Sequence, residues 1–92
     1  MPVYTISYPE SYIKRARRFL AKHPALTRQY GKTLELLEIN PFHPSLRLHP
    51  LKGRLTGLHA FSINVSYRIT LEFIINEKEI ILVNVGSHEE VY

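Results

Sequence analysis

The residue pattern between Phe61 and Phe73 limits the fold of this chain more than any other feature. The odd-numbered positions are apolar and the even-numbered ones are polar: Phe61, Ile63, Val65, Tyr67, Ile69, Leu71 and Phe73 alternate with Ser62, Asn64, Ser66, Arg68, Thr70 and Glu72. A period of two predicts β-structure with one buried face and one open face. The run is longer than most single strands, so we expect a tight turn near residues 64–66 to divide it into two.

The first half of the chain predicts a strand followed by two helices. Residues 3–8 are mostly β-branched or aromatic and indicate a strand that Pro9 ends. Apolar residues then recur at helical spacing in two stretches of about fourteen residues each. They are Tyr12, Ile13, Ala16, Phe19 and Leu20 in the first, and Leu26, Tyr30, Leu34 and Leu37 in the second. Pro24 suits the first turn of the second helix, so the two form a helical hairpin.

The remaining segments complete an α+β domain. Residues 39–50 are a proline-rich connection, and the alternation of residues 46–49 suggests an extended segment. Residues 52–54 and 76–78 predict turns, and residues 79–85 predict a last strand that lies centrally because its start is apolar on both faces. The expected fold is therefore an N-terminal strand, an α-helical hairpin and a largely antiparallel sheet of three or more strands. The helices cover one face, and the open face carries Arg68.

Size and charge narrow the functional classes. A length of 92 residues predicts one domain spanning residues 1–92. No apolar run approaches the roughly 20 residues that cross a bilayer, and the start does not resemble a secretory signal, so we expect a cytoplasmic protein. Twelve Lys and Arg against 8 acidic residues give a net charge of +4. This charge suits a polyanion or an acidic protein partner, although a role in solubility alone is the alternative.

The 5 histidines raise the question of a metal site, but the composition and the spacing argue against one. The chain has no Cys and no Asp, and no two histidines stand in a His-x₃-His arrangement on a helix. We therefore expect neither a metal nor another cofactor. His23, His43 and His59 are interpreted as structural or exposed, although His59 lies near enough to the site segment to contribute.

The end of the last predicted strand carries side chains that can transfer protons. His88 and Tyr92 follow its apolar run within a few residues. A second imidazole, His49, and the strand guanidinium of Arg68 lie upstream. Together these groups suggest metal-free acid–base chemistry on a phosphate ester. Each also has a plainer interpretation. His88 could be a polar residue near the terminus and Tyr92 a packing anchor. His49 could be an exposed loop histidine without a role, and Arg68 could pair with Glu72.

Four fragments resemble a known family. They are Leu51-Lys52-Gly53, Gly57-Leu58, Ser66-Tyr67-Arg68-Ile69 and Val85-Gly86-Ser87-His88-Glu89-Glu90-Val91-Tyr92. In this order and spacing they resemble the RelE/ParE toxin superfamily, most closely its RelE, YoeB and YafQ branches. The likeness extends over nearly the whole chain. It implies a toxin of a type II toxin–antitoxin system with a cognate antitoxin as its partner. It also implies a fold like that of small microbial RNases and cleavage of mRNA, in many members on the ribosome.

By position, the resemblance assigns catalytic roles to His49, Arg68, His88 and Tyr92. Lys52 and Arg54 fall in a region that is basic in the RelE branch, where they would bind RNA and add positive field. Ser62 stands where several active members carry Arg, Lys or His.

The chemistry that these roles imply is attack by an RNA 2′-OH on the adjacent phosphate. In our hypothesis His49 is the general base and His88 the general acid, and each such group contributes about 10²–10⁴-fold. Arg68 would stabilise charge on the non-bridging oxygens, for which its planar fork suits phosphate. Tyr92 would orient the phosphate or stack on a base. The products are a 2′,3′-cyclic phosphate and a 5′-OH.

A basic stripe on the first predicted helix adds a second RNA-binding candidate. Lys14, Arg18 and Lys22 are spaced four residues apart, with Arg15 and Arg17 beside them. Like charges at this spacing disfavour a helix slightly, so contact with RNA phosphates is one explanation for them. A solvated face and an antitoxin contact are the others.

Two other functions are compatible with the same fold. A ParE-like member would inhibit DNA gyrase by binding without catalysis, and a degenerate member would only hold an antitoxin. Retention of His49, Arg68, His88 and Tyr92 favours the nuclease, whereas Ser62 favours the alternatives.

Overall fold

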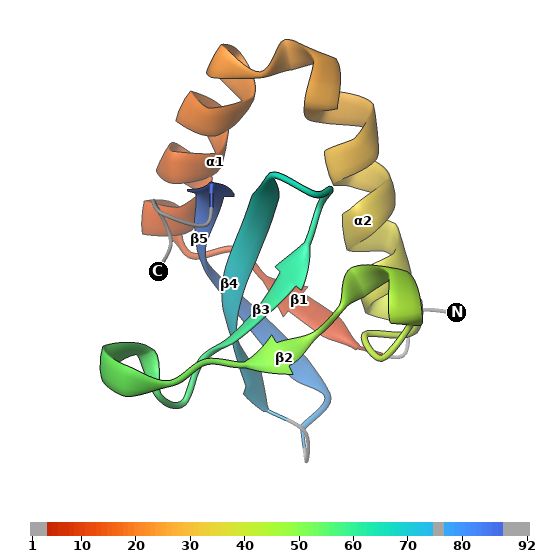
Figure 1. Ribbon diagram of the computed structural model, residues 1–92, viewed down its shortest axis with the longest axis vertical. Helices are drawn as coiled ribbons and strands as arrows, with labels where there is room; N and C mark the ends of the chain where they lie inside the picture. The colour runs from red at the N-terminus through yellow and green to blue at the C-terminus, as the bar shows by residue number, and fades with distance from the viewer. Residues whose placement is uncertain (1–3, 75–76, 88–92) are drawn as a thin grey trace.

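The chain folds into a sheet of five strands that carries two helices on one face (Figure 1). The computed structural model describes residues 4–74 and 77–87. Its strands and α-helices are β1 (Thr5–Ser7), α1 (Glu10–Lys22), α2 (Thr27–Ile39), β2 (His49–Pro50), β3 (His59–Ser62), β4 (Tyr67–Ile74) and β5 (Glu79–Ser87). Single 3₁₀ turns are η1 (Pro24–Leu26), η2 (Pro44–Leu46) and η3 (Gly53–Leu55). Within the described residues, no helix is long and apolar enough to cross a bilayer.

The strand order explains why the last strand is so apolar. The sheet runs β1-β5-β4-β3-β2, in which β1 is parallel to β5 and every other neighbouring pair is antiparallel. Strand β5 therefore lies inside the sheet, and Ile80 and Leu82 on it are fully buried. The predicted α+β architecture, with its helical hairpin and largely antiparallel sheet, is confirmed.

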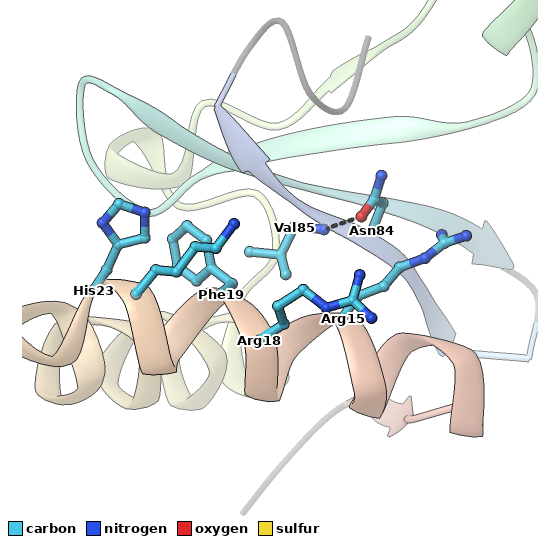
Figure 2. A pocket seen from close by; sticks show the side chains of 7 residues that line it. Arg15, Arg18, Phe19, His23, Asn84 and Val85 are labelled. Carbon is cyan, nitrogen blue, oxygen red and sulfur yellow. Dashed lines mark hydrogen bonds between the residues drawn. The ribbon is translucent and has the colours of Figure 1, made fainter.

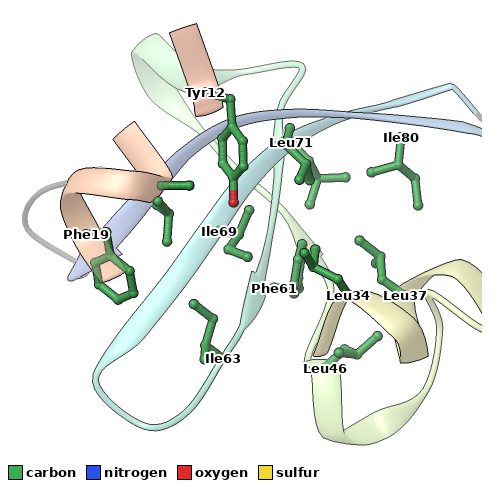
Figure 3. Packing of buried hydrophobic residues seen from close by; sticks show 13 residues of the cluster. Tyr12, Phe19, Leu34, Leu37, Leu46, Phe61, Ile63, Ile69, Leu71 and Ile80 are labelled. Carbon is green, nitrogen blue, oxygen red and sulfur yellow. The ribbon is translucent and has the colours of Figure 1, made fainter. Parts of the chain in front are cut away.

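The core lies between the helices and the face of the sheet that carries the odd-numbered residues of β3 and β4 (Figure 3). Phe61, Ile69 and Leu71 are each 0% exposed, and they pack against apolar residues of both helices. The helical residues are Tyr12, Ala16 and Phe19 of α1 and Leu34 and Leu37 of α2. Burying one large apolar side chain contributes about 1.5–3 kcal/mol, so this face supplies most of the hydrophobic stabilisation.

The alternation of the β3–β4 run is interrupted where the two strands turn. The turn lies at residues 63–66, as predicted. Val65 was expected on the buried face, but its side chain is 91% exposed. The reason is local: the side-chain oxygen of Asn64 accepts the backbone N–H groups of Ser66 and Tyr67, each at 2.9 Å, and this bends the chain out of the pleat at Val65.

The segment before β2 is a turn and not the extended stretch that its alternation predicted. Pro44 opens the 3₁₀ turn η2, and the Nδ1 atom of His43 accepts the backbone N–H of Ser45 at 3.2 Å. Arg47 follows in the left-handed conformation with a φ of 51°. A fixed proline φ and a side-chain cap favour a turn over a strand, so only His49 and Pro50 pair with β3.

Candidate functional site

The face of the sheet away from the helices brings His49 and Arg68 onto one surface. His49 is the register partner of Ala60, and Ala60 is the partner of Thr70. Arg68, two residues before Thr70 on β4, faces Ser62 of β3. Residues that are partners, or two apart on one strand, share a face of the sheet. Strand and residue spacings put the Cα atoms of His49 and Arg68 about 12 Å apart, with β3 between them.

The ring of His49 is fixed by its own loop. Its Nδ1 atom lies 2.9 Å from the backbone oxygen of Arg47. A carbonyl oxygen can only accept a hydrogen bond, so Nδ1 carries the proton and donates it. In the neutral ring the lone pair is then on Nε2. The ring is exposed on the short edge strand β2. The atom of this ring that can accept a proton is therefore Nε2.

Both basic residues that were predicted beside His49 share a concavity with it. His49, Pro50, Leu51, Lys52, Arg54 and Leu55 line a hollow of about 350 Å³ formed by β2 and the turn η3. Two cations and an imidazole beside apolar side chains suit a nucleic acid. Its phosphates would contact the cations, and its bases would contact the leucines. Lys52 and Arg54 are both exposed, so their charges face solvent and any ligand that enters.

The guanidinium of Arg68 is held against the β3–β4 turn. Its Nη1 atom donates to the backbone oxygens of Asn64 at 2.8 Å, Val65 at 3.2 Å and Tyr67 at 3.3 Å. It does not pair with Glu72, which is exposed farther along β4. All three bonds to the described residues use Nη1, so the Nη2 and Nε donors are available for an anion.

Arg68 lines a second concavity, which shares no lining residue with that of His49. This hollow of about 210 Å³ is bordered by Ser45, Arg47, Ser62, Ile63, Asn64, Val65 and Arg68. Arg47 contacts His49 through its backbone oxygen and also lines the hollow of Arg68. Sequence reasoning did not select Arg47. Its position two residues before His49 was the available signal, and the expected extended conformation would have put it on the same face.

The two remaining predicted catalytic residues, His88 and Tyr92, lie outside the described residues. Strand β5 is described as far as Ser87, which pairs with Tyr67, and Gly86 pairs with Arg68. The described part of β5 therefore ends one residue beyond the row that contains Arg68.

The basic residues of α1 are only partly brought together. Arg15, Arg18 and Lys22 line a third concavity of about 220 Å³ between α1 and β5 (Figure 2). Arg15 also donates from Nη1 to the backbone oxygen of Val83 at 3.0 Å, which ties the helix to the strand. Lys14 instead forms an exposed i, i+4 ion pair with Glu10 at 3.8 Å. Of the predicted stripe Lys14, Arg18 and Lys22, the last two therefore share a hollow, together with Arg15.

The other histidines have structural positions. The ring of His23 packs at a tilt against those of Phe19 and Tyr67, with centroids 4.8 Å and 4.7 Å away. His43 caps η2. Burial, and secondarily the nearby His49, lower the pKa of His59, which is half-buried on β3. Across residues 4–74 and 77–87, no three His, Cys, Asp or Glu side chains gather in a way that could hold a metal ion.

Known structures share this architecture over its whole length. No protein-family model matches the sequence, and no curated protein sequence matches it either. Among solved structures, YafQ from E. coli strain BL21(DE3) is 15% identical and superimposes over 97% of this chain and 98% of its own with a TM-score of 0.78. A chain of the E. coli DinJ-YafQ toxin-antitoxin complex is 18% identical over 97% of both chains, with a TM-score of 0.76. A metal-bound toxin from Helicobacter pylori is 24% identical over 98% of this chain and 100% of its own, with a TM-score of 0.75. The chain therefore has the fold that these toxin structures share.

Proposed function

We propose that this protein is the toxin of a type II toxin–antitoxin system and cleaves mRNA on the ribosome without a metal ion. The observation that carries the proposal is the bond from Nδ1 of His49 to the backbone oxygen of Arg47. It assigns the lone pair to Nε2 of an exposed imidazole in a basic hollow. A general base needs this combination of a fixed tautomer, access to solvent and adjacent positive charge when its substrate is RNA.

The proposed reaction is a transfer within the RNA chain. Nε2 of His49 takes the proton of the 2′-OH, and the 2′-oxygen forms a bond to the adjacent phosphorus. The bond from phosphorus to the 5′-oxygen breaks, and that oxygen takes a proton from His88. Nη2 and Nε of Arg68 donate to the non-bridging oxygens, where negative charge builds up in the transition state. Tyr92 orients the phosphate or stacks on a neighbouring base.

Two sets of basic residues are proposed to hold the substrate. Lys52 and Arg54 contact the RNA beside the cleaved bond, since they share the hollow of His49. Arg18 and Lys22 on α1 contact phosphates of ribosomal RNA. Lys14 makes a weaker contribution because Glu10 partly neutralises it. Such contacts release counterions, so ribosome affinity should fall steeply as salt is added.

The proposed protein partner is a cognate antitoxin. Two of the similar structures are described as a DinJ-YafQ toxin-antitoxin complex and a RelBE2 toxin-antitoxin complex. In this chain Ile39, the last residue of α2, is 57% exposed, and Phe42, three residues beyond it, is 60% exposed. Large apolar side chains that stay exposed suit a protein interface. Expression of this chain alone should arrest growth, and co-expression with the antitoxin should restore it.

The experiment that tests the proposal adds purified protein to a translation reaction and maps new 5′ ends on the mRNA, with naked RNA alongside. We expect new ends at ribosome-occupied positions, and fewer ends on naked RNA. Translation that stays intact, combined with inhibition of gyrase supercoiling, would replace the proposal with the ParE-like alternative. Neither effect, with unimpaired growth, would indicate a module that only binds an antitoxin.

A further inference from the structure

We infer that Arg47 is a second phosphate-binding residue, and that it holds one RNA phosphate together with Arg68 in the hollow above Ser62. The inference rests on the proposed function, because it names a contact within the same site. Its first support is position. Arg47 and Arg68 come from different parts of the chain, the loop before β2 and the strand β4, yet both line the same hollow of about 210 Å³.

The charge of this hollow indicates an anionic ligand. Its lining contains two guanidinium groups and no carboxylate: Ser45, Arg47, Ser62, Ile63, Asn64, Val65 and Arg68. Like charges held in one hollow repel each other, and an entering phosphate would relieve that repulsion. Ser62, the cross-strand partner of Arg68, is small and neutral, so it leaves room between the two guanidinium groups.

The backbone of Arg47 gives independent support. Its φ of 51° lies in the left-handed region, where glycine would fit without strain. The conformation is fixed on both sides: its N–H donates to the oxygen of Pro44 at 3.2 Å, and its own oxygen accepts from His49 at 2.9 Å. These two bonds fix the point on the loop from which the Arg47 side chain starts.

The same residue relates the phosphate to the base. The carbonyl group of Arg47 selects the tautomer of His49, and the same residue borders the hollow of Arg68. Both contacts leave from one residue with a constrained backbone. In the inferred site, a phosphate bound between the two arginines lies on the face of the sheet that also carries His49, the proposed base.

The test compares substitutions at Arg47 with a matched control. Lys78, in the turn before β5, is also exposed, basic and left-handed, with a φ of 51°. Arg47→Gln and Lys78→Gln therefore remove the same charge from the same backbone conformation. Arg47→Lys keeps the charge without the planar fork, and Arg47→Gly relieves the strain while removing the side chain.

Two readouts are needed: mRNA cleavage in a translation reaction, and binding of the purified protein to a single-stranded RNA oligonucleotide whose 2′-OH groups are methylated. For Arg47→Gln we expect cleavage to fall about 10²-fold, as when one donor to a developing anion is removed. The slope of log K against log salt should become shallower by about 0.7, the value for one phosphate contact on a single strand. Arg47→Lys should restore the slope but not the rate, and Lys78→Gln should change neither.

Arg47→Gly separates function from stability. We expect its melting temperature to equal or exceed that of the parent and its cleavage to match that of Arg47→Gln. If the parent cleaves mRNA and Arg47→Gln behaves like Lys78→Gln, the inference is wrong and the proposed function stands. If the parent does not cleave but Arg47→Gln still loses one phosphate contact, the function is wrong and the contact stands. An oligonucleotide that fails to bind the parent at low salt overturns the inference.

Discussion

The two faces of this sheet are built from alternate residues of the same strands but have different organisation. On the face under the helices, Phe61, Ile69 and Leu71 are sealed from solvent. On the other face, Ser62 and Arg68 border a hollow, and His49 stands on a strand of only two residues. One run of sequence thus encodes a stabilising surface and a polar site on alternate residues. Substitutions on the two faces should therefore affect different measurements.

The largest expected effect is on the polar face. His49→Asn keeps a donor for the backbone oxygen of Arg47 but removes the base, so mRNA cleavage should fall about 10²–10⁴-fold. His43→Asn is the matched control, because His43 is also an exposed histidine of this loop and Asn can still cap η2. The cleavage rates of the two variants, measured from the mapped mRNA ends, test this prediction. Equal cleavage by both variants would remove the proposed role of His49.

A core substitution should lower the stability of the protein and leave the cleavage rate of its folded fraction unchanged. Leu71→Ala deletes a side chain that is 0% exposed beneath the helices and should lower the free energy of unfolding by about 2–5 kcal/mol. Because Leu71 points away from the polar face, the folded fraction of this variant should cleave at the parental rate. Chemical denaturation and a cleavage assay normalised to folded protein test this. Loss of specific activity in the folded fraction would show that the two faces are coupled.

The cations of α1 should have an intermediate, salt-dependent effect. Arg18→Gln combined with Lys22→Gln removes two charges from one hollow and should make the salt slope of ribosome binding shallower by about 1.4, if ribosomal RNA is contacted as a single strand. Lys14→Gln removes a charge that Glu10 already partly neutralises, so its effect should be smaller. Ribosome affinity measured at several salt concentrations distinguishes them. An unchanged slope in the double variant would restrict RNA contact to the sheet.

A smaller effect is expected at the polar contact inside the core. The hydroxyl oxygens of Tyr12 and Tyr30 lie 2.6 Å apart, and Tyr12 is 1% exposed. Burial, and secondarily Tyr30, raise the pKa of Tyr12 far above its ordinary value, so it stays protonated. Tyr12→Phe should destabilise the protein by about 0.5–1.5 kcal/mol without changing cleavage. Denaturant titrations of both single variants and the double variant will measure the coupling, and strictly additive losses would mean that the two hydroxyls do not interact.

The smallest effect concerns pH. Burial lowers the folded-state pKa of His59 below 6.5. As pH falls below 6.5, the unfolded chain binds a proton at this ring more readily than the folded chain, so stability declines until the lowered pKa is reached. Above 6.5 the ring contributes no pH dependence. The loss of stability between about pH 7.5 and about pH 5.5 should be smaller in His59→Asn than in the parent. An identical loss in both proteins would assign the dependence to other groups.

The elements that sequence reasoning predicted well are those set by long periodic patterns. The alternation around Ile69 and the helical spacing around Leu34 each repeat often enough to specify one buried face. Local turn chemistry explains the failures. Val65 and Arg47 both continue an alternating pattern, but backbone N–H groups that donate to the side chains of Asn64 and His43 turn the chain near these positions.

The site was predictable to the extent that it is local in sequence. His49, Lys52 and Arg54 lie within one short segment, and they share one hollow. Arg47 and Arg68 border a common hollow only because β2, β3 and β4 pair in a particular register. That register depends on the turn lengths and on the packing of the opposite face, which no single motif of this sequence contains.

The chemical groups at the two ends of each cut in the RNA report whether the 2′-OH was the attacking group. mRNA recovered from a translation reaction is treated so that the terminal groups on either side of each cut can be identified, and the cleavage step is repeated on isolated RNA with a chelator present. Attack by the 2′-OH with acid–base assistance predicts a 2′,3′-cyclic phosphate and a 5′-OH, and cleavage of isolated RNA that the chelator does not affect. A 3′-OH with a 5′-phosphate, or cleavage that stops when metal ions are removed, would contradict it.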